Sequence, residues 1–402
     1  MGQGNAAITA AMFWLCCSSG ALAKSETTKQ RDEFPPNALQ IITPEPLLPQ
    51  RVGNQPLSPL QRQNLEMALD QLSAQAAAKL KAGDRVGAFE IWNRELRLRR
   101  TLGPLSEVKA LGRVGAIAWG ENQQTELQII THRLQAVQGL TKFPPTVNLE
   151  LLQSLGKAYQ QVRLPQQALD VYQQILVAER QQHDQSAQEA TLNTIAELAL
   201  SWFDYPKAAT TYKELLGWAR TKGDHLSEIT YIQQLAYIYD QAKQPQQAVT
   251  FKQQLADIYL NEKDSTQLPA LRLAIASDYE SLGKVKEAFQ NYKQAYTSAW
   301  SLEQYYRAAS ALRRLVALYR SQGQINEALQ TSQILLQADE RAANQYGMMN
   351  TYDQIGQIYL QRLDYPAAKA AFQKGLELAK QLQYQETYFT QQIAQVTQRI
   401  SK

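Results

Sequence analysis

The chain has 402 residues, of which 44% are hydrophobic and 19% are charged, so it can bury a core and does not belong to the disordered class. Its formal net charge of +4 is small for this length, and the composition therefore does not call for nucleic acid or an anionic membrane as a partner. Length alone allows about two or three globular domains, but a repeat array escapes that estimate because each unit packs only on its neighbours.

Residues 1–23 are predicted to form a secretory signal peptide. An apolar segment precedes Ala21-Leu22-Ala23, which is typical of a cleavage site before Lys24. The apolar segment is short for a transmembrane span. A lipoprotein site at Cys16 and myristoylation at Gly2 are alternatives, although Trp14-Leu15 and Ala6 fit those patterns poorly. The sequence therefore favours export, with cleavage after Ala23.

The two cysteines, Cys16 and Cys17, both lie in this leader. A chain cleaved after Ala23 would have no thiol, which excludes disulfides, thiolate metal sites and cysteine catalysis. Residues 24–57 follow as a proline-rich extended linker. We favour a tether between leader and repeats. The alternative is an arm that packs on the array through the apolar side chains Leu39, Ile41, Ile42, Leu47 and Leu48.

From residue 58 onward, small residues recur at a constant interval of 40, and we call these positions the anchors. The anchors are Ala88, Gln128, Ala168, Ala208, Ala248, Ala288, Ala328 and Ala368. Nine residues before the anchor the chain has mostly aromatic residues, namely Trp119, Tyr159, Tyr239, Tyr279, Tyr319 and Tyr359. Four residues after it lie Trp92, His132, Tyr172, Tyr212, Lys252, Tyr292, Ser332 and Phe372. Apolar residues recur at helical spacing and no stretch alternates as a strand does, so the fold is predicted to be all-α.

The stretch Leu155-Gly156-x-x-Tyr159, followed by Ala168 and Tyr172, resembles the tetratricopeptide repeat (TPR). The resemblance implies a right-handed superhelical solenoid of about eight helical hairpins over residues 58–402, with a capping helix at about 385–401. The interval of 40 is longer than the usual 34 and is similar to long-repeat TPR proteins, in which helices of about 16–18 residues absorb most of the difference. HEAT and armadillo repeats have similar periods but lack this ladder of small and aromatic residues.

No motif for catalysis or for a cofactor is found. The phosphate-binding loop GxxxxGK[ST] and the motifs HExxH and GxSxG are absent. The histidines share no helix face: His132 is predicted to pack between helices, and His183 and His225 to lie in loops. The sequence therefore predicts a protein that is not an enzyme and has no metal and no cofactor. A run of basic residues is interpreted as a solvated helix end, with a nucleic-acid or anion patch as the alternative: Arg94, Arg97, Arg99 and Arg100.

The resemblance also implies a concave groove lined by the first helix of each hairpin, at the positions that precede each anchor by eighteen, fifteen, eleven and eight places. The candidate partner-binding residues are Arg113, Gln153, Lys157, Asn193, Glu197, Gln233, Tyr237, Asp240, Arg313, Arg320, Asn350, Asp353 and Gln357. They are polar and mixed in charge, and the carboxylate clamp of chaperone-binding TPR domains is not carried over to them.

We therefore expect a non-catalytic scaffold that binds a protein or peptide in this groove outside the cytosol, in the periplasm or thylakoid lumen. Its Gln-rich and Ala-rich composition is similar to exported bacterial, possibly cyanobacterial, TPR proteins. No nucleic acid and no small-molecule substrate are expected. The alternative is an assembly or stabilisation factor for a membrane complex, in which the leader is retained as an anchor. An enzyme with an unrecognised site is the remaining alternative.

Overall fold

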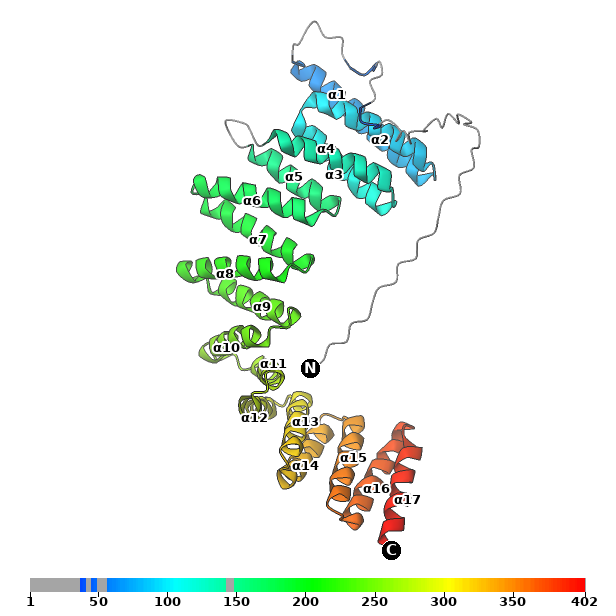
Figure 1. Ribbon diagram of the computed structural model, residues 1–402, viewed down its shortest axis with the longest axis vertical. Helices are drawn as coiled ribbons and strands as arrows, with labels where there is room; N and C mark the ends of the chain where they lie inside the picture. Colours follow the sequence, from blue (N-terminus) through cyan, green and yellow to red (C-terminus); the bar gives the residue numbers. More distant parts are fainter. Residues whose placement is uncertain (1–36, 41–44, 49–55, 142–147, 402) are drawn as a thin grey trace, which may run out of the picture. The chain divides into compact units, whose positions relative to one another are not determined.

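A computed structural model describes residues 37–40, 45–48, 56–141 and 148–401. The predicted signal peptide and most of the predicted linker lie outside the described residues. Within them every regular element is helical, so the predicted all-α fold is confirmed (Figure 1). The helices are α1 (Pro59–Lys81), α2 (Arg85–Arg99), a short 3-10 helix (Arg100–Leu102), α3 (Pro104–Gly120), α4 (Gln124–Leu140), α5 (Leu149–Gln161), α6 (Pro165–Gln181), α7 (Gln185–Ser201), α8 (Tyr205–Lys222), α9 (His225–Gln241), α10 (Pro245–Asn261), α11 (Leu268–Ser281), α12 (Val285–Ser301), α13 (Tyr305–Ser321), α14 (Ile325–Arg341), α15 (Gln345–Gln361), α16 (Tyr365–Leu382) and α17 (Glu386–Ile400).

The chain divides into two compact units, Met1–Leu98 and Arg99–Lys402. In the first unit, parts of the proline-rich segment lie against α2. Glu45 accepts two hydrogen bonds from the Arg94 guanidinium, at 2.6 and 2.9 Å, and Arg97 donates to the carbonyl oxygen of Ala38 at 2.6 Å. Leu39 is buried at 2% exposure. For these residues the packed arm is found rather than the tether that we favoured, and Arg94 and Arg97 hold it instead of forming a solvated helix end.

In the second unit, helices that follow one another in the chain pack against each other from α3 to α17. Figure 1 shows them as a succession of antiparallel hairpins, each made of an odd-numbered and an even-numbered helix. The last helix, α17, packs on α16 and buries Phe389 and Val396, while Gln391 and Gln395 on its other side are exposed. This polar outer face is what the end of a stacked array requires.

The alanine anchors form the core of the hairpins. Ala88, Ala168, Ala208, Ala248, Ala288, Ala328 and Ala368 all have 0% exposure. The paired first helix comes close enough to need glycine in two hairpins. A Cβ atom on Gly156 would lie 2.9 Å from the Tyr172 ring, and one on Gly356 would lie 2.5 Å from the Phe372 ring. The small and aromatic residues of the ladder are therefore packing residues.

One anchor was predicted wrongly. Each of the second helices α6, α8, α10, α12, α14 and α16 has its N-cap four residues before its anchor, whereas α4 has its N-cap at Gln123. The anchor of α4 is therefore Leu127, which is 7% exposed, and Gln128 points to solvent. The irregular connection through the 3-10 helix before α3 places this hairpin one residue earlier than the constant interval predicts.

The same shift moves the neighbouring ladder positions of this hairpin. Nine residues before Leu127 lies Ala118, which is fully buried, whereas Trp119 is 50% exposed. Four residues after it lies Thr131, and His132 is exposed rather than packed between helices as predicted.

From Arg163 to Gln383, a turn with a left-handed residue occurs at every twentieth position. These residues are Arg163, His183, Phe203, Gly223, Lys243, Lys263, Gly283, Glu303, Gly323, Ala343, Leu363 and Gln383. Most helices between them have 17 or 18 residues. The interval of 40 thus consists of two equal halves, and helix length rather than loop length fills it.

Candidate functional site

The predicted groove residues lie on the odd-numbered helices of the second unit and are at least partly exposed. Gln153, Lys157, Glu197, Gln233 and Tyr237 are exposed, and Arg113, Asn193, Asp240, Arg313, Arg320, Asn350, Asp353 and Gln357 are half-buried. Tyr237 on α9 exposes 51% of its surface. The exposed surface of these residues is compatible with a binding face.

Several of these side chains also link neighbouring helices. Asn193 donates to the Tyr231 hydroxyl at 3.3 Å, and Gln233 donates to the Tyr259 hydroxyl at 3.1 Å. At the C-terminal end, the Tyr388 hydroxyl of α17 donates to Asp353 at 2.9 Å and accepts from Gln357 at 3.2 Å. These residues therefore hold the array together, and a role in partner binding stays a prediction for them.

The corrected anchor at Leu127 changes the predicted groove on α3. The first groove position, eighteen places before this anchor, is Lys109, whose ammonium lies 3.3 Å from Glu150 of α5. Glu150 is the first groove position of the next hairpin, eighteen places before Ala168, so the ion pair joins equivalent positions on adjacent first helices. Arg113 lies one residue outside this register, because the groove position fifteen places before Leu127 is Gly112.

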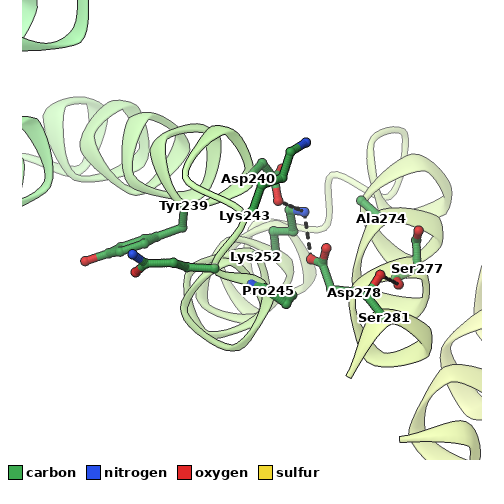
Figure 2. A pocket seen from close by; sticks show the side chains of 10 residues that line it. Tyr239, Asp240, Lys243, Pro245, Lys252, Ala274, Ser277, Asp278 and Ser281 are labelled. Carbon is green, nitrogen blue, oxygen red and sulfur yellow. Dashed lines mark hydrogen bonds and ion pairs between the residues drawn. The ribbon is translucent and has the colours of Figure 1, made fainter. Parts of the chain in front are cut away.

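A cavity of about 470 Å³ opens on this face of the second unit between α9, α10 and α11. Six of the side chains that line it are Tyr239, Asp240, Lys243, Lys252, Ser277 and Asp278 (Figure 2). Asp240 and Ser277 occupy groove positions, eight places before Ala248 and eleven places before Ala288 respectively. The cavity is therefore a hollow within the predicted groove.

Three charged side chains from three helices meet at the floor of this cavity, and we call Lys252, Asp240 and Asp278 the charge triad. The Lys252 ammonium donates to Asp240 Oδ1 and to Asp278 Oδ2, each at 2.7 Å (Figure 2). Lys252 is 6% exposed. The side chains of Asp278 and Asp240 are 15% and 38% exposed, so Asp240 is the member open to a ligand.

The charge triad replaces residues that are hydrophobic in other hairpins. Four residues after the anchor, where Lys252 lies, the other second helices mostly have large aromatic residues: Trp92, Tyr172, Tyr212, Tyr292 and Phe372. Ten residues before the anchor, where Asp278 lies, the other hairpins of α5–α16 have Ala158, Leu198, Ile238, Leu318 and Ile358, which are all buried. A charged pair at these two core positions is found in this part of the array and not in those hairpins.

Burial and pairing act in opposite directions on Asp278. Burial raises the pKa of its carboxyl group above the ordinary value because the charged form loses hydration, and the hydrogen bond from Lys252 opposes that shift. With one ammonium and two carboxylates, the charge triad has a net charge of −1 when all three groups are ionised. The charge triad is thus a preorganised anionic group with hydroxyl groups beside it, and the Lys243 side chain adds a second cation to the lining of the cavity.

Sequence reasoning found Asp240 but missed Lys252 and Asp278 as site residues. Lys252 differs from the aromatic residues that most hairpins have four residues after the anchor. Asp278 differs in the same way from the hydrophobic residues that the other hairpins have ten residues before the anchor. The spacing could not show that the two exceptions contact each other, because they belong to neighbouring hairpins.

The described residues contain neither a cluster of metal-ligating side chains nor a helix suited to span a membrane. Nowhere in residues 37–40, 45–48, 56–141 or 148–401 do three or more His, Cys, Asp or Glu side chains gather as a metal site would require. Among the helices that the structure describes, none combines the length with the sustained apolar character of a bilayer span.

Comparison with protein-family models identifies one segment of the chain. Residues 350–382, which cover most of α15 and all of α16, match the model described as Tetratricopeptide repeat. The match includes Gly356, Tyr359, Ala368 and Phe372, the ladder residues of that hairpin. The match supports the prediction that this is a TPR repeat protein.

The solved structures that resemble this chain are distant from it in sequence. No curated protein sequence matches the chain. The crystal structure of BtubC (BKLC) from P. vanneervenii aligns at 18% identity and a TM-score of 0.36, covering 55% of this chain and 92% of that one. That of MamA protein aligns at 18% identity and 0.35, covering 48% and 92%. The apo form of RapI aligns at 10% identity and 0.38, covering 83% and 98%.

Proposed function

We propose that the protein is a non-catalytic scaffold that binds a partner protein or peptide on the odd-numbered helices of the second unit, centred on the cavity at α9–α11. The observation that carries the proposal is the charge triad. Charged residues occupy two core positions that are hydrophobic in neighbouring hairpins, and they do so at the floor of a cavity on the predicted binding face.

The energetics of burial support this proposal. A buried ion pair often contributes less stability than hydrophobic residues of similar volume, because both charges lose hydration. Packing of the array therefore does not require Lys252 and Asp278. A ligand with a cationic or hydrogen-bonding group can bind to Asp240 of the charge triad, whereas hydrophobic residues could not provide such a contact.

Tyr237 supplies the apolar part of the proposed site. It lies three residues before Asp240 on α9, on the same helix face, and it is 51% exposed. Tyrosine is one of the residues that most often dominate binding energy at protein interfaces, because its ring is large and rigid. An aromatic side chain beside the exposed carboxylate of Asp240 suits a peptide that carries a Lys or Arg residue.

The proposal is tested by affinity capture with the purified protein, comparing Tyr237→Ala with wild type. Tyr346→Ala on α15 is the matched control, because Tyr346 is 53% exposed. We expect a specific partner to be retained by wild type and Tyr346→Ala and to be lost by Tyr237→Ala. A partner set that Tyr237→Ala leaves unchanged would remove the α9–α11 face from consideration. A charge reversal at Arg313 and Arg320 tests the α13 part of the groove in the same way.

The proposed location is outside the cytosol, in the periplasm or thylakoid lumen of a bacterium, possibly a cyanobacterium. It is supported by the apolar segment and the Ala21-Leu22-Ala23 pattern of the leader. The equal spacing of the left-handed turns supports assignment to the long-repeat TPR type. The second candidate function, a membrane-anchored assembly or stabilisation factor, differs in the fate of the leader. Amino-terminal sequencing that starts at Lys24 supports the exported scaffold, and an intact leader supports the anchored factor.

A further inference from the structure

A second cavity, of about 600 Å³, lies between α11, α13 and the end of α14. The residues that matter for its chemistry are Leu273, Tyr305, Tyr306, Arg307, Ser310 and Arg341. Leu273 and Ser310 occupy groove positions, fifteen places before Ala288 and eighteen places before Ala328 respectively. Because α11 also contributes Ser277 and Asp278 to the first cavity, one helix borders both.

The guanidinium of Arg341 is held in place by aromatic side chains. It lies 5.5 Å from the centroid of the Trp300 ring and 5.3 Å from that of Tyr305, and its Nη1 donates to the Tyr305 hydroxyl at 3.0 Å. The Trp300 and Tyr305 rings themselves meet edge to face at 5.6 Å. An arginine fixed in this way loses little side-chain freedom when a ligand binds.

Neither arginine of this cavity has a carboxylate partner among the described residues. Arg307 donates to the amide oxygen of Gln304 at 2.9 Å, and Arg341 to the Tyr305 hydroxyl. The acidic residue that lines the cavity is Glu303, which is exposed and, within the described part of the chain, forms no ion pair with either arginine. The cavity therefore has two guanidinium groups that form no ion pair with a carboxylate of the described residues.

Another arginine of α13 shows the contrast. Arg313, on the same helix as Arg307, pairs with the buried Asp339 at 3.3 Å. Arg313 thus has a carboxylate beside it, whereas Arg307 and Arg341 form no such ion pair among the described residues.

We propose that this second cavity binds an oxyanion, a carboxylate or a phosphoryl group, carried on a peptide partner next to an apolar or aromatic group. Arg341 and Arg307 donate charge-assisted hydrogen bonds to the oxygens, as guanidinium groups do with planar or tetrahedral oxyanions. The Tyr306 side chain, which is 69% exposed, and Leu273 contact the apolar part of the ligand. The use of this site by a peptide rests on the proposed scaffold function, whereas the oxyanion site itself does not.

Small probes test the site directly on the full protein. Phenyl phosphate and phenylacetate carry the two oxyanions on an aromatic ring, and benzylamine carries a cation on the same ring. Isothermal titration calorimetry or ligand-observed NMR should detect binding of at least one anionic probe, with a dissociation constant on the order of millimolar for a ligand of this size, and none of benzylamine. Tighter binding of phenyl phosphate identifies a phosphoryl ligand, and equal or tighter binding of phenylacetate identifies a carboxylate.

Variants assign the binding to this cavity. Arg341→Gln should raise the dissociation constant of the anionic probe about tenfold, because it removes a charge-assisted hydrogen bond. Glu303→Gln should strengthen binding of the anionic probe, because it removes a negative charge that repels the anion at the edge of the cavity. Arg314→Gln is the control: Arg314 is another arginine of α13 that does not line the cavity, and its loss should leave binding unchanged.

The proposal is overturned if neither anionic probe binds, or if Arg341→Gln binds them as wild type does. Tyr237→Ala should leave probe binding intact even if it abolishes partner capture. Failure of the oxyanion site is therefore distinguishable from failure of the proposed scaffold function.

Discussion

Exchanging the buried charges for the residues of the other hairpins tests what Lys252 and Asp278 contribute. The exchange is Lys252→Tyr with Asp278→Leu, each alone and both together. Tyr at position 252 would resemble Tyr292, whose hydroxyl donates to Glu280 at 2.8 Å, twelve residues earlier. Asp240 is twelve residues before position 252, so the same contact is available there.

The magnitudes follow from burial. Lys252→Tyr alone leaves the Asp278 side chain, 15% exposed, without its ammonium, which should cost about 3–5 kcal/mol in the free energy of unfolding. Asp278→Leu alone leaves Lys252 paired with the more exposed Asp240, so the loss should be smaller, about 1–3 kcal/mol. The double exchange should be between neutral and about 4 kcal/mol more stable than wild type, because neither charge remains to be desolvated.

Urea unfolding followed by circular dichroism measures the three variants. Because repeat arrays can unfold in parts, hydrogen exchange of α9–α11 should accompany it and localise the change. The reasoning requires the double variant to recover the losses of the single ones. If its loss instead equals their sum, Lys252 and Asp278 are not coupled and the argument from the repeat columns is wrong.

Three further predictions concern stability alone. Glu179 and Asp339 occupy equivalent positions four intervals of 40 apart. Asp339 pairs with Arg313, whereas the residue equivalent to Arg313 near Glu179 is Gln153. Gln153→Arg should therefore raise the urea midpoint of unfolding, because it supplies the cation that Glu179 lacks. Burial raises the pKa of Glu179, and among the described residues its Oε2 has no hydrogen-bond partner. Because this pKa is above the unfolded value of 4.5, the ionised group destabilises the fold, so Glu179→Gln should stabilise by about 1 kcal/mol at neutral pH. A pH titration of unfolding should show this gain fading as the pH falls through the raised pKa toward 4.5. Leu363 has a left-handed backbone with φ of 61° and is 66% exposed. Leu363→Gly should therefore raise the melting temperature by relieving about 1 kcal/mol of backbone strain. An unchanged or lower melting temperature would contradict the turn geometry.

Most of the fold could be predicted because packing in a repeat array is local. Each anchor contacts residues at fixed distances along the chain, so the interval between Ala168 and Ala208 already contains the hairpin geometry. The wrong anchor at Gln128 lies where the constant interval of 40 is interrupted. The 3-10 helix before α3 shortens one step by a residue, and a constant interval cannot detect such a change.

The candidate site could be predicted only in part. Exposure on the first helices follows from the register, which is why Tyr237 and Asp240 were named. The meeting of Lys252 with Asp278 depends on which face of α10 packs on α11, and that is a property of the stack rather than of one repeat. Arg341 was missed for the same reason, since its partners are the Trp300 ring of the preceding hairpin and the tyrosine that begins α13.

Partner capture with Lys252→Tyr and Asp278→Leu combined with Asp240→Asn tests the central claim most directly, because this variant is expected to keep the fold while losing all three charges of the charge triad. The account predicts that circular dichroism remains as in wild type, that hydrogen exchange of α9–α11 is no faster than in wild type, and that the captured partner is lost. Retention of the partner by this variant would contradict the claim that the cavity at α9–α11 is the centre of the binding site.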